Sequence, residues 1–248
     1  LCVWVVRAKT GASADPEQVW VEAEADFKAG RYDRAEAGLA RLARLRAPTP
    51  LDWLLRAQVA MLRGRDNQAV DDLAKVPDGH RMGPQARLLA GQVELRSKRA
   101  RSAERWLLEA TRLDPSLVQA HRELVYIYGM QLRRPELRQQ FRILSGLTAL
   151  TFENVWHWCL TRNSTWEPTE IVDEISQWIE ADPDDRWSRL ALADNFRRLG
   201  RWSSVEKTLA PLPDSDPDAR ALRARTALDR GDDEAAETLL AGGPEDHP

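Results

Sequence analysis

Residues 99–115, RARSAERWLLEATRLDP, decide the fold of this chain, because their small, large and helix-ending residues recur at a fixed distance along the sequence. Counting from Lys98, a small residue follows after 5 positions at Ala103, a large apolar residue after 9 at Leu107, and another small residue after 12. These spacings describe one face of a helix. Pro115 ends that helix, because the residue before a proline is disfavoured in the α region. The stretch therefore predicts the second helix of a helical pair.

The same pattern returns every 34 residues. Its origins are Gly30, Gly64, Lys98, Leu132, Trp166 and Gly200, followed after a shorter step of 31 by Gly231. The residue 5 positions after each origin is apolar: Ala35, Ala69, Ala103, Leu137, Ile171, Val205 and Ala236. The residue 9 positions after it is large and apolar: Leu39, Leu73, Leu107, Phe141, Ile175, Leu209 and Leu240. Seven residues before each origin, most units have a small residue: Ala23, Ala57, Gly91, Val125, Cys159, Ala193 and Ala224. Each unit is thus predicted to be a helical hairpin with small residues where its helices cross.

A 34-residue period of helix, turn and helix resembles the tetratricopeptide repeat. The resemblance covers about residues 16 to 243, and its best units are GPQARLLAGQVELRSKRARSAERWLLEATRLDP and RWSRLALADNFRRLGRWSSVEKTLAPLPDSDP. The chain departs from the family where Lys98, Leu132 and Trp166 replace the turn glycine. The resemblance implies an all-α fold, a right-handed superhelical solenoid of about seven helical hairpins.

The unit boundaries follow from the period. We expect units near residues 16–49, 50–83, 84–117, 118–151, 152–185, 186–216 and 217–243, with residues 244–248 starting a further segment. Asp15-Pro16 is a strong helix start, because an N-cap carboxylate precedes a proline at the first helical position. We expect the helices of the first unit to cover about residues 16–29 and 33–46.

The first 15 residues are predicted to lie outside the repeats. LCVWVV is an apolar run followed by Arg7, Lys9 and small polar residues, and we interpret it as the tail of a truncated membrane anchor or signal segment. It is far shorter than the roughly 20 residues that span a bilayer. The alternative is a frayed or capping N-terminal piece. An anchor would place the protein at a bacterial cell envelope, and without one it would be cytoplasmic.

Charge is distributed unevenly along the chain, although the formal net charge is only -3. Counting Lys and Arg against Asp and Glu gives 12 and 12 in residues 1–80, 13 and 6 in residues 81–150, and 11 and 21 in residues 151–248. The segment charges are therefore 0, +7 and -10. This asymmetry steers an acidic ligand toward the middle units, or it reflects only solvated outer faces. The many arginines reflect either a GC-rich genome, which we favour, or a need for guanidinium chemistry, and we expect a bacterial protein.

The sequence contains no recognisable catalytic or cofactor motif. A phosphate-binding P-loop, a dinucleotide fingerprint, a His-Glu-x-x-His pair and a Gly-x-Ser-x-Gly elbow are all missing from it. Cys2 and Cys159 are too few for a disulfide framework, and Cys159 is expected to be a buried structural thiol. His157 and Cys159 point to different helix faces. We therefore expect no enzyme activity in this segment, no cofactor, no metal site and no small-molecule substrate.

Tryptophan is concentrated in the fifth unit, which holds Trp156, Trp158, Trp166, Trp178 and Trp187. We expect Trp158 and Trp178 to pack in the core, whereas Trp156 and Trp187 are equally compatible with the core or with a contact site. An exposed tryptophan would mark a binding surface, because this residue is enriched in binding hot spots.

The most probable function implied by the resemblance is a protein or peptide interaction scaffold that uses the concave groove lined by the first helices. The matching positions include Gln58, Gln92, Gln119, Arg122, Tyr126, Trp156, Asn163, Trp187, Asp194 and Arg197. We expect a partner to contact Arg122, Tyr126 and Trp156, because Tyr126 follows Arg122 by 4 positions and Trp156 follows it by 34. The same three residues have an alternative role in packing between neighbouring hairpins.

Two further function classes remain open. One is a substrate-recruiting module of a larger enzyme whose catalytic domain lies outside these residues. The other is a helical-repeat RNA-binding protein, which only the +7 middle segment favours and the -10 segment opposes. We therefore expect a protein or peptide partner and no nucleic acid.

Overall fold

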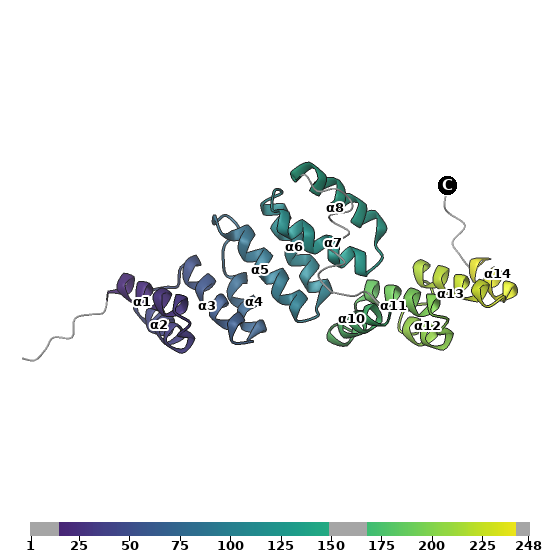
Figure 1. Cartoon of the computed structure of the whole chain (residues 1–248), viewed down its shortest axis with the longest axis horizontal. Coiled ribbons are helices and arrows are strands. Elements are labelled where there is room, and N and C mark those ends of the chain that lie inside the picture. The colour runs from purple at the N-terminus through teal and green to yellow at the C-terminus, as the bar shows by residue number, and fades with distance from the viewer. Residues whose placement is uncertain (1–14, 149–167, 242–248) are drawn as a thin grey trace, which may run out of the picture. The chain divides into compact units, whose positions relative to one another are not determined.

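The computed structural model describes residues 15–148 and 168–241 (Figure 1). Within these residues the chain forms helices and no strands, which confirms the predicted all-α fold. The helices are α1 (Pro16–Lys28), α2 (Tyr32–Leu45), α3 (Pro50–Leu62), α4 (Asp66–Ala74), α5 (Gly83–Arg96), α6 (Ala100–Leu113), α7 (Val118–Met130), α8 (Arg134–Leu147), α10 (Pro168–Ala181), α11 (Arg186–Arg198), α12 (Trp202–Leu209), α13 (Pro217–Asp229) and α14 (Asp233–Ala241). None of these helices is long and apolar enough to cross a membrane.

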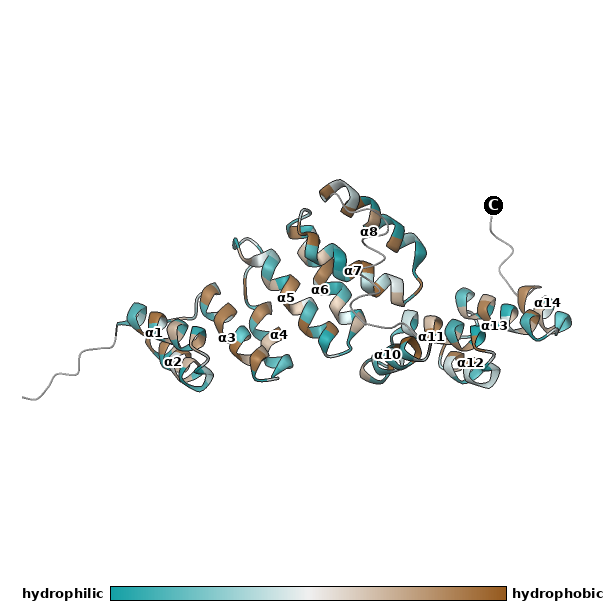
Figure 2. Cartoon of the chain, viewed as in Figure 1, coloured by the Kyte–Doolittle hydropathy of each residue, from teal (hydrophilic) through white to brown (hydrophobic). Residues whose placement is uncertain are grey.

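Consecutive helices pair as hairpins in two compact units. The first unit, residues 1–82, contains the hairpins α1–α2 and α3–α4. The second, residues 83–248, contains α5–α6, α7–α8, α11–α12 and α13–α14, together with α10. Figure 2 shows apolar and polar residues side by side along the helices, as expected for helices that bury one face. The predicted repeat of helical hairpins is thus present in both units.

The predicted start of the first hairpin is confirmed. The Asp15 side chain accepts a hydrogen bond of 3.1 Å from the backbone amide of Glu17, and Pro16 is the first residue of α1. A carboxylate at this position satisfies an amide that has no partner within the helix. The bounds of α1 and α2 agree with the expected ranges to within one residue at each end.

Each described repeat origin is the residue that turns the chain between the two helices of a hairpin. These residues share a left-handed backbone, with φ of 73° at Gly30, 69° at Gly64, 64° at Lys98, 56° at Leu132, 68° at Gly200 and 76° at Gly231. Glycine adopts this conformation without steric penalty, whereas other L-residues are strained by about 1 to 2 kcal/mol. The period found in the sequence is therefore the period of one backbone conformation. Trp166 lies outside the described residues.

Small residues lie where paired helices approach closely. A Cβ atom added to Gly91 in α5 would lie 2.6 Å from Cγ of Leu107 in α6, a distance that real Cβ atoms essentially never show. In the first hairpin, a Cβ on Gly38 would lie 3.0 Å from Cβ of Ala23. Ala103 is fully buried, as predicted for a residue at a helix crossing. The pattern fails at Leu240, which is 60% exposed near the end of α14.

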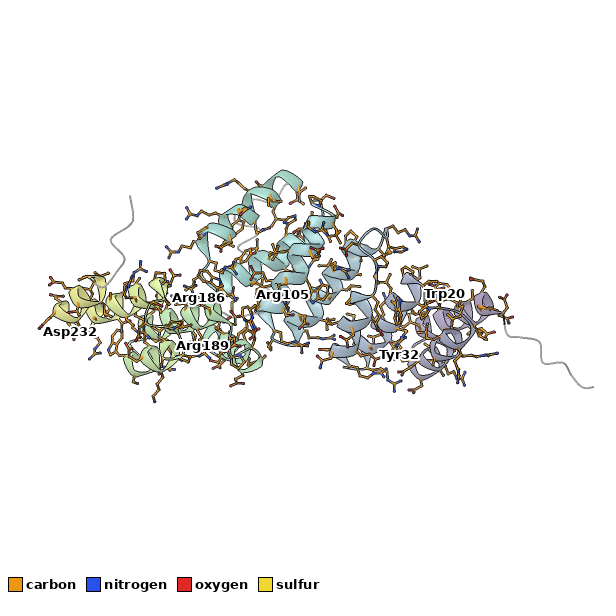
Figure 3. All side chains as sticks on the ribbon, turned by 180° about the vertical axis from the view of Figure 1, so that it is seen from behind. Trp20, Tyr32, Arg105, Arg186, Arg189 and Asp232 are labelled. Carbon is orange, nitrogen blue, oxygen red and sulfur yellow. The ribbon has the colours of Figure 1, made fainter. Side chains whose placement is uncertain are left out.

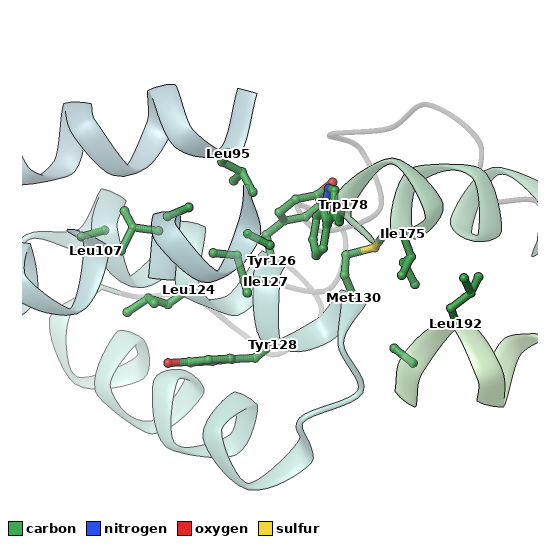
Figure 4. Packing of buried hydrophobic residues seen from close by; sticks show 14 of the residues in the cluster. Leu95, Leu107, Leu124, Tyr126, Ile127, Tyr128, Met130, Ile175, Trp178 and Leu192 are labelled. Atoms are coloured by element: carbon green, nitrogen blue, oxygen red, sulfur yellow. The ribbon is translucent and has the colours of Figure 1, made fainter. Parts of the chain in front are cut away.

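The largest apolar cluster joins α10 and α11 to α5, α6 and α7 (Figure 4). Trp178 on α10 is fully buried, which confirms its predicted place in the core, and its ring lies edge-on to Tyr126 with 5.9 Å between ring centroids. Two ion pairs also connect α10 and the residue directly after it to the α5–α6 hairpin, Lys98 with Glu174 at 2.5 Å and Arg101 with Asp182 at 2.8 Å. Helix α10 is thus fixed by contacts to residues far away in the sequence.

Several sequence predictions fall on residues that the structure does not describe. They concern the expected anchor in residues 1–14, Cys159, Trp156, Trp158 and Asn163. The outer boundaries of the repeat array likewise remain predictions.

Candidate partner-binding groove

An open cavity of about 660 Å³ lies between the first turn of α8, the length of α11 and the start of α13. Its lining includes three of the predicted partner-binding residues, Trp187, Asp194 and Arg197. Helices α11 and α13 are first helices of their hairpins, which is where the repeat pattern expects a partner to bind. The third wall of the groove comes from a second helix, α8, which the sequence pattern did not indicate.

Trp187 is held in the groove by two arginines. The guanidinium carbon of Arg133 lies 4.9 Å from the centroid of the Trp187 ring, and that of Arg186 lies 4.6 Å from it. Such contacts between a cation and an aromatic face are favourable. Figure 3 labels Arg186 at the start of α11. The ring is therefore half-buried with a defined orientation.

Both arginines are anchored by carboxylates. Arg133 contacts Glu104 at 2.8 Å and Glu136 at 3.0 Å. Arg186 donates hydrogen bonds of 2.6 and 2.8 Å to the two carboxylate oxygens of Asp216. Burial alone would raise the pKa of Asp216, but the hydrogen bonds from Arg186 and from two backbone amides lower it below its usual value. The carboxylate thus stays charged and fixes the wall of the groove.

The groove carries an excess of positive charge. Among the described residues, its lining holds six arginines, at positions 133, 134, 138, 197, 198 and 225, and three acidic residues, Glu136, Asp194 and Asp218, which is an excess of three positive charges. All three acids are already paired: Glu136 with Arg133, Asp194 with Arg197 and Arg198, and Asp218 with Arg186. The charge excess is thus not neutralised inside the groove.

Gln92 and Gln119 come together in a different place. Their side-chain amides both donate to Oε1 of Glu123, at 3.2 and 2.9 Å. Glu123 is only 2% exposed, so these hydrogen bonds satisfy a buried carboxylate between α5 and α7. Glu123 was not among the predicted site residues, although Gln119 precedes it by four positions on the same helix face. We assign this cluster to packing between the two helices.

The prediction that Tyr126 is available to a partner is wrong. Tyr126 is 4% exposed, and its hydroxyl donates to Oε1 of Glu174 at 3.4 Å. Burial of a large aromatic ring is strongly favourable. Trp178 of α10 packs against the ring of Tyr126 and covers it with apolar surface. Tyr126 therefore follows the alternative of packing between helices. Arg122 is half-buried, Gln58 is half-buried in the first unit, and Trp156 and Asn163 lie outside the described residues.

Sequence reasoning missed Arg133, Arg134 and Arg138, because it placed the groove on first helices alone. The signal that could have found them is the +7 charge of residues 81–150, to which all three contribute. No group of His, Cys, Asp and Glu in the described residues is arranged to hold a metal ion.

Comparison with known proteins identifies the fold and no closer relationship. No protein-family model matches the chain, and no curated protein matches it. Among solved structures, a tetratricopeptide repeat protein from Parabacteroides merdae is 15% identical, with 93% of this chain and 94% of that chain covered and a TM-score of 0.51. PilF of Pseudomonas aeruginosa is 13% identical, with 90% and 88% covered and a TM-score of 0.39. YrrB, described as having an unusual peptide-binding site, is 12% identical, with 92% of each chain covered and a TM-score of 0.40.

The last two likenesses are too loose to support an argument. The first spans nearly all of both chains, and it agrees with the 34-residue period, the left-handed turn at each described origin and the small residues at the helix crossings. This chain therefore has the fold of a tetratricopeptide repeat protein.

Proposed function

We propose that this chain is a protein-interaction scaffold whose groove between α8, α11 and α13 holds an extended segment of a partner protein. The observation that supports this most is the presence of Trp187 and Arg197 in one open cavity of about 660 Å³. Tryptophan and arginine are the residue types enriched at binding hot spots, and the cavity has the size of known ligand sites. Other repeat folds also use extended grooves to bind partners.

The side chains of the groove favour binding over catalysis. Arginine stays protonated at any ordinary pH, so it cannot accept a proton from a substrate. The carboxylates of Glu136 and Asp194 are engaged in ion pairs with Arg133 and Arg197. These groups are suited to holding and orienting a ligand, and we infer that this segment acts without chemistry of its own.

The second proposed contact region, around Arg122 and Trp156, stays a separate prediction. Arg122 forms no hydrogen bond or ion pair with any residue in the described part of the chain, and it is only half-buried. Tyr126 is buried and Trp156 lies outside the described residues, so Arg122 is the described residue of the three that a partner can reach.

Site-directed cross-linking tests the proposed function. A photoreactive phenylalanine analogue at Ala221, an exposed position in the wall of the groove, should capture a defined partner in cells of the source organism. The same analogue at Arg105, exposed on α6 and outside the groove, is the matched control. A partner captured from Ala221 and not from Arg105 supports the scaffold. Identical products from both positions, or none from Ala221, would contradict it.

A further inference from the structure

Three arginines of the groove are left without an acidic partner. Arg134, Arg138 and Arg225 are exposed, and no ion pair joins them to any residue of the described segments. Arg134 and Arg138 belong to α8, while Arg225 belongs to α13, so they lie on two different walls. Resting on the proposed function, we propose that the groove binds an acidic peptide segment whose carboxylates pair with these three arginines.

The acidic residues that line the groove are paired whereas three of its arginines are not, and this difference favours an acidic partner. Each acidic residue among the described lining residues is already paired, so a basic peptide finds no free carboxylate on these walls. An incoming carboxylate, by contrast, meets guanidinium groups that need not leave another partner first. Ion pairs between arginine and carboxylate are also geometrically specific, because two parallel hydrogen bonds can form. Charge complementarity therefore selects an acidic ligand.

Folding does not explain Arg134. It is the first residue of α8, and positive charge is unfavourable at a helix N-terminus because the helix dipole is positive there. Arg138 makes only a hydrogen bond of 3.3 Å to the carbonyl oxygen of Arg134. A residue that opposes a local rule without a compensating contact is expected at a functional site.

The groove also offers an apolar contact beside these charges. Leu132 lines it, is 38% exposed, and has a left-handed backbone with φ of 56° where four other described hairpins have glycine. A leucine held in that conformation is strained, yet its side chain remains accessible to a ligand. We therefore expect the bound peptide to combine acidic residues with an apolar side chain.

A nucleic acid fits the groove less well than a peptide. Residues 151–248 carry a net charge of -10, which would repel a polyanion that extends beyond the groove. A short acidic peptide avoids this repulsion.

Fluorescence anisotropy with labelled peptides tests the proposal on the full chain. The probe is a short peptide that mixes glutamate with leucine, and its control replaces each glutamate with glutamine. We expect the glutamate peptide to bind, and to weaken as salt is added, because exposed ion pairs are screened. The combined variant Arg134→Gln, Arg138→Gln and Arg225→Gln should weaken binding about tenfold, which corresponds to about 1.4 kcal/mol.

Arg105→Gln is the matched control, since it removes the same charge outside the groove and should leave the affinity unchanged. Charge reversal with Arg134→Glu should weaken the glutamate peptide more than Arg134→Gln does. Equal affinity for both peptides, or an unchanged affinity in the combined variant, overturns the acidic ligand. So does stronger displacement of the probe by polyuridine than by unlabelled peptide, which would indicate a nucleic-acid groove. If cross-linking from Ala221 is as strong in the combined variant as in the unchanged chain, the scaffold stands while the acidic ligand falls.

Discussion

The α5–α6 hairpin and the α11–α12 hairpin share one backbone design but place their glycines differently. In α11–α12, the turn residue is Gly200 with φ of 68° and the crossing residue is the buried Ala193. In α5–α6, the turn residue is Lys98 with φ of 64° and the glycine lies at the crossing, as Gly91. Gly200 allows an unusual backbone conformation, whereas Gly91 leaves space for the helix that packs against it. The backbone of Lys98 is strained, and its side chain forms an ion pair with Glu174 of α10.

The largest expected loss of stability comes from filling the space at the helix crossing, where Gly91 lies. Gly91→Ala should destabilise the second unit by about 1 to 3 kcal/mol, because the new methyl group would lie 2.6 Å from Cγ of Leu107 and the core would have to shift. Urea unfolding measures the change. Gly146→Ala in α8 is the control, since a Cβ there meets no atom of the described residues within 4 Å and alanine should stabilise a helix by about 0.5 to 1 kcal/mol. Stability unchanged by Gly91→Ala would show that the crossing is looser than described.

Replacing the glycine of a left-handed turn should cause a smaller loss of stability. Gly200→Ala should cost about 1 kcal/mol, because alanine is strained at a φ of 68° although the nearest side-chain atom, on Trp202, is 3.7 Å from the new methyl group. Gly79→Ala adds the same methyl group in open space at a position without a left-handed φ. Thermal unfolding of both variants separates strain from crowding. An equal change in both would argue against a conformational role for Gly200.

Lys98→Gly should change stability least, because two effects oppose each other. Glycine relieves the strained backbone at a φ of 64°, but the variant loses the ion pair between Lys98 and Glu174. The pair is partly buried, and exposed pairs contribute about 0.2 to 1 kcal/mol, so we take the upper part of that range and expect a net change within about 0.5 kcal/mol. A double-mutant cycle with Glu174→Gln measures the pair itself. A coupling energy of zero would remove the stated reason for a lysine at this turn.

The sequence predicted the hairpins well because their determinants are local. The apolar spacing, the proline stops and the turn positions all act within about one repeat, and the left-handed turns occur at Gly30, Gly64, Lys98, Leu132, Gly200 and Gly231 as the period requires. Local patterns also placed Trp187, Asp194 and Arg197 on first helices, and these three share one groove.

The rest depends on contacts between distant repeats. A period assumes that each hairpin packs against the next, so it could not indicate that Trp178 of α10 would cover Tyr126, or that Lys98 would meet Glu174, 76 residues further along the chain. For the same reason it missed Arg134 and Arg138, which reach the groove from a second helix. Long-range placement of this kind is not encoded in the spacing of apolar residues.

Leu132 connects the turn comparison to the proposed function, since it occupies a glycine-type turn with φ of 56° and also lines the groove. The central claim is that its side chain serves binding rather than folding. The direct measurement is the unfolding temperature of Leu132→Gly together with its affinity for the glutamate-leucine peptide. We predict a stability gain of up to about 1 kcal/mol from relieved strain, together with weaker peptide binding. Loss of stability with unchanged affinity would contradict the claim, because it would make Leu132 a packing residue alone.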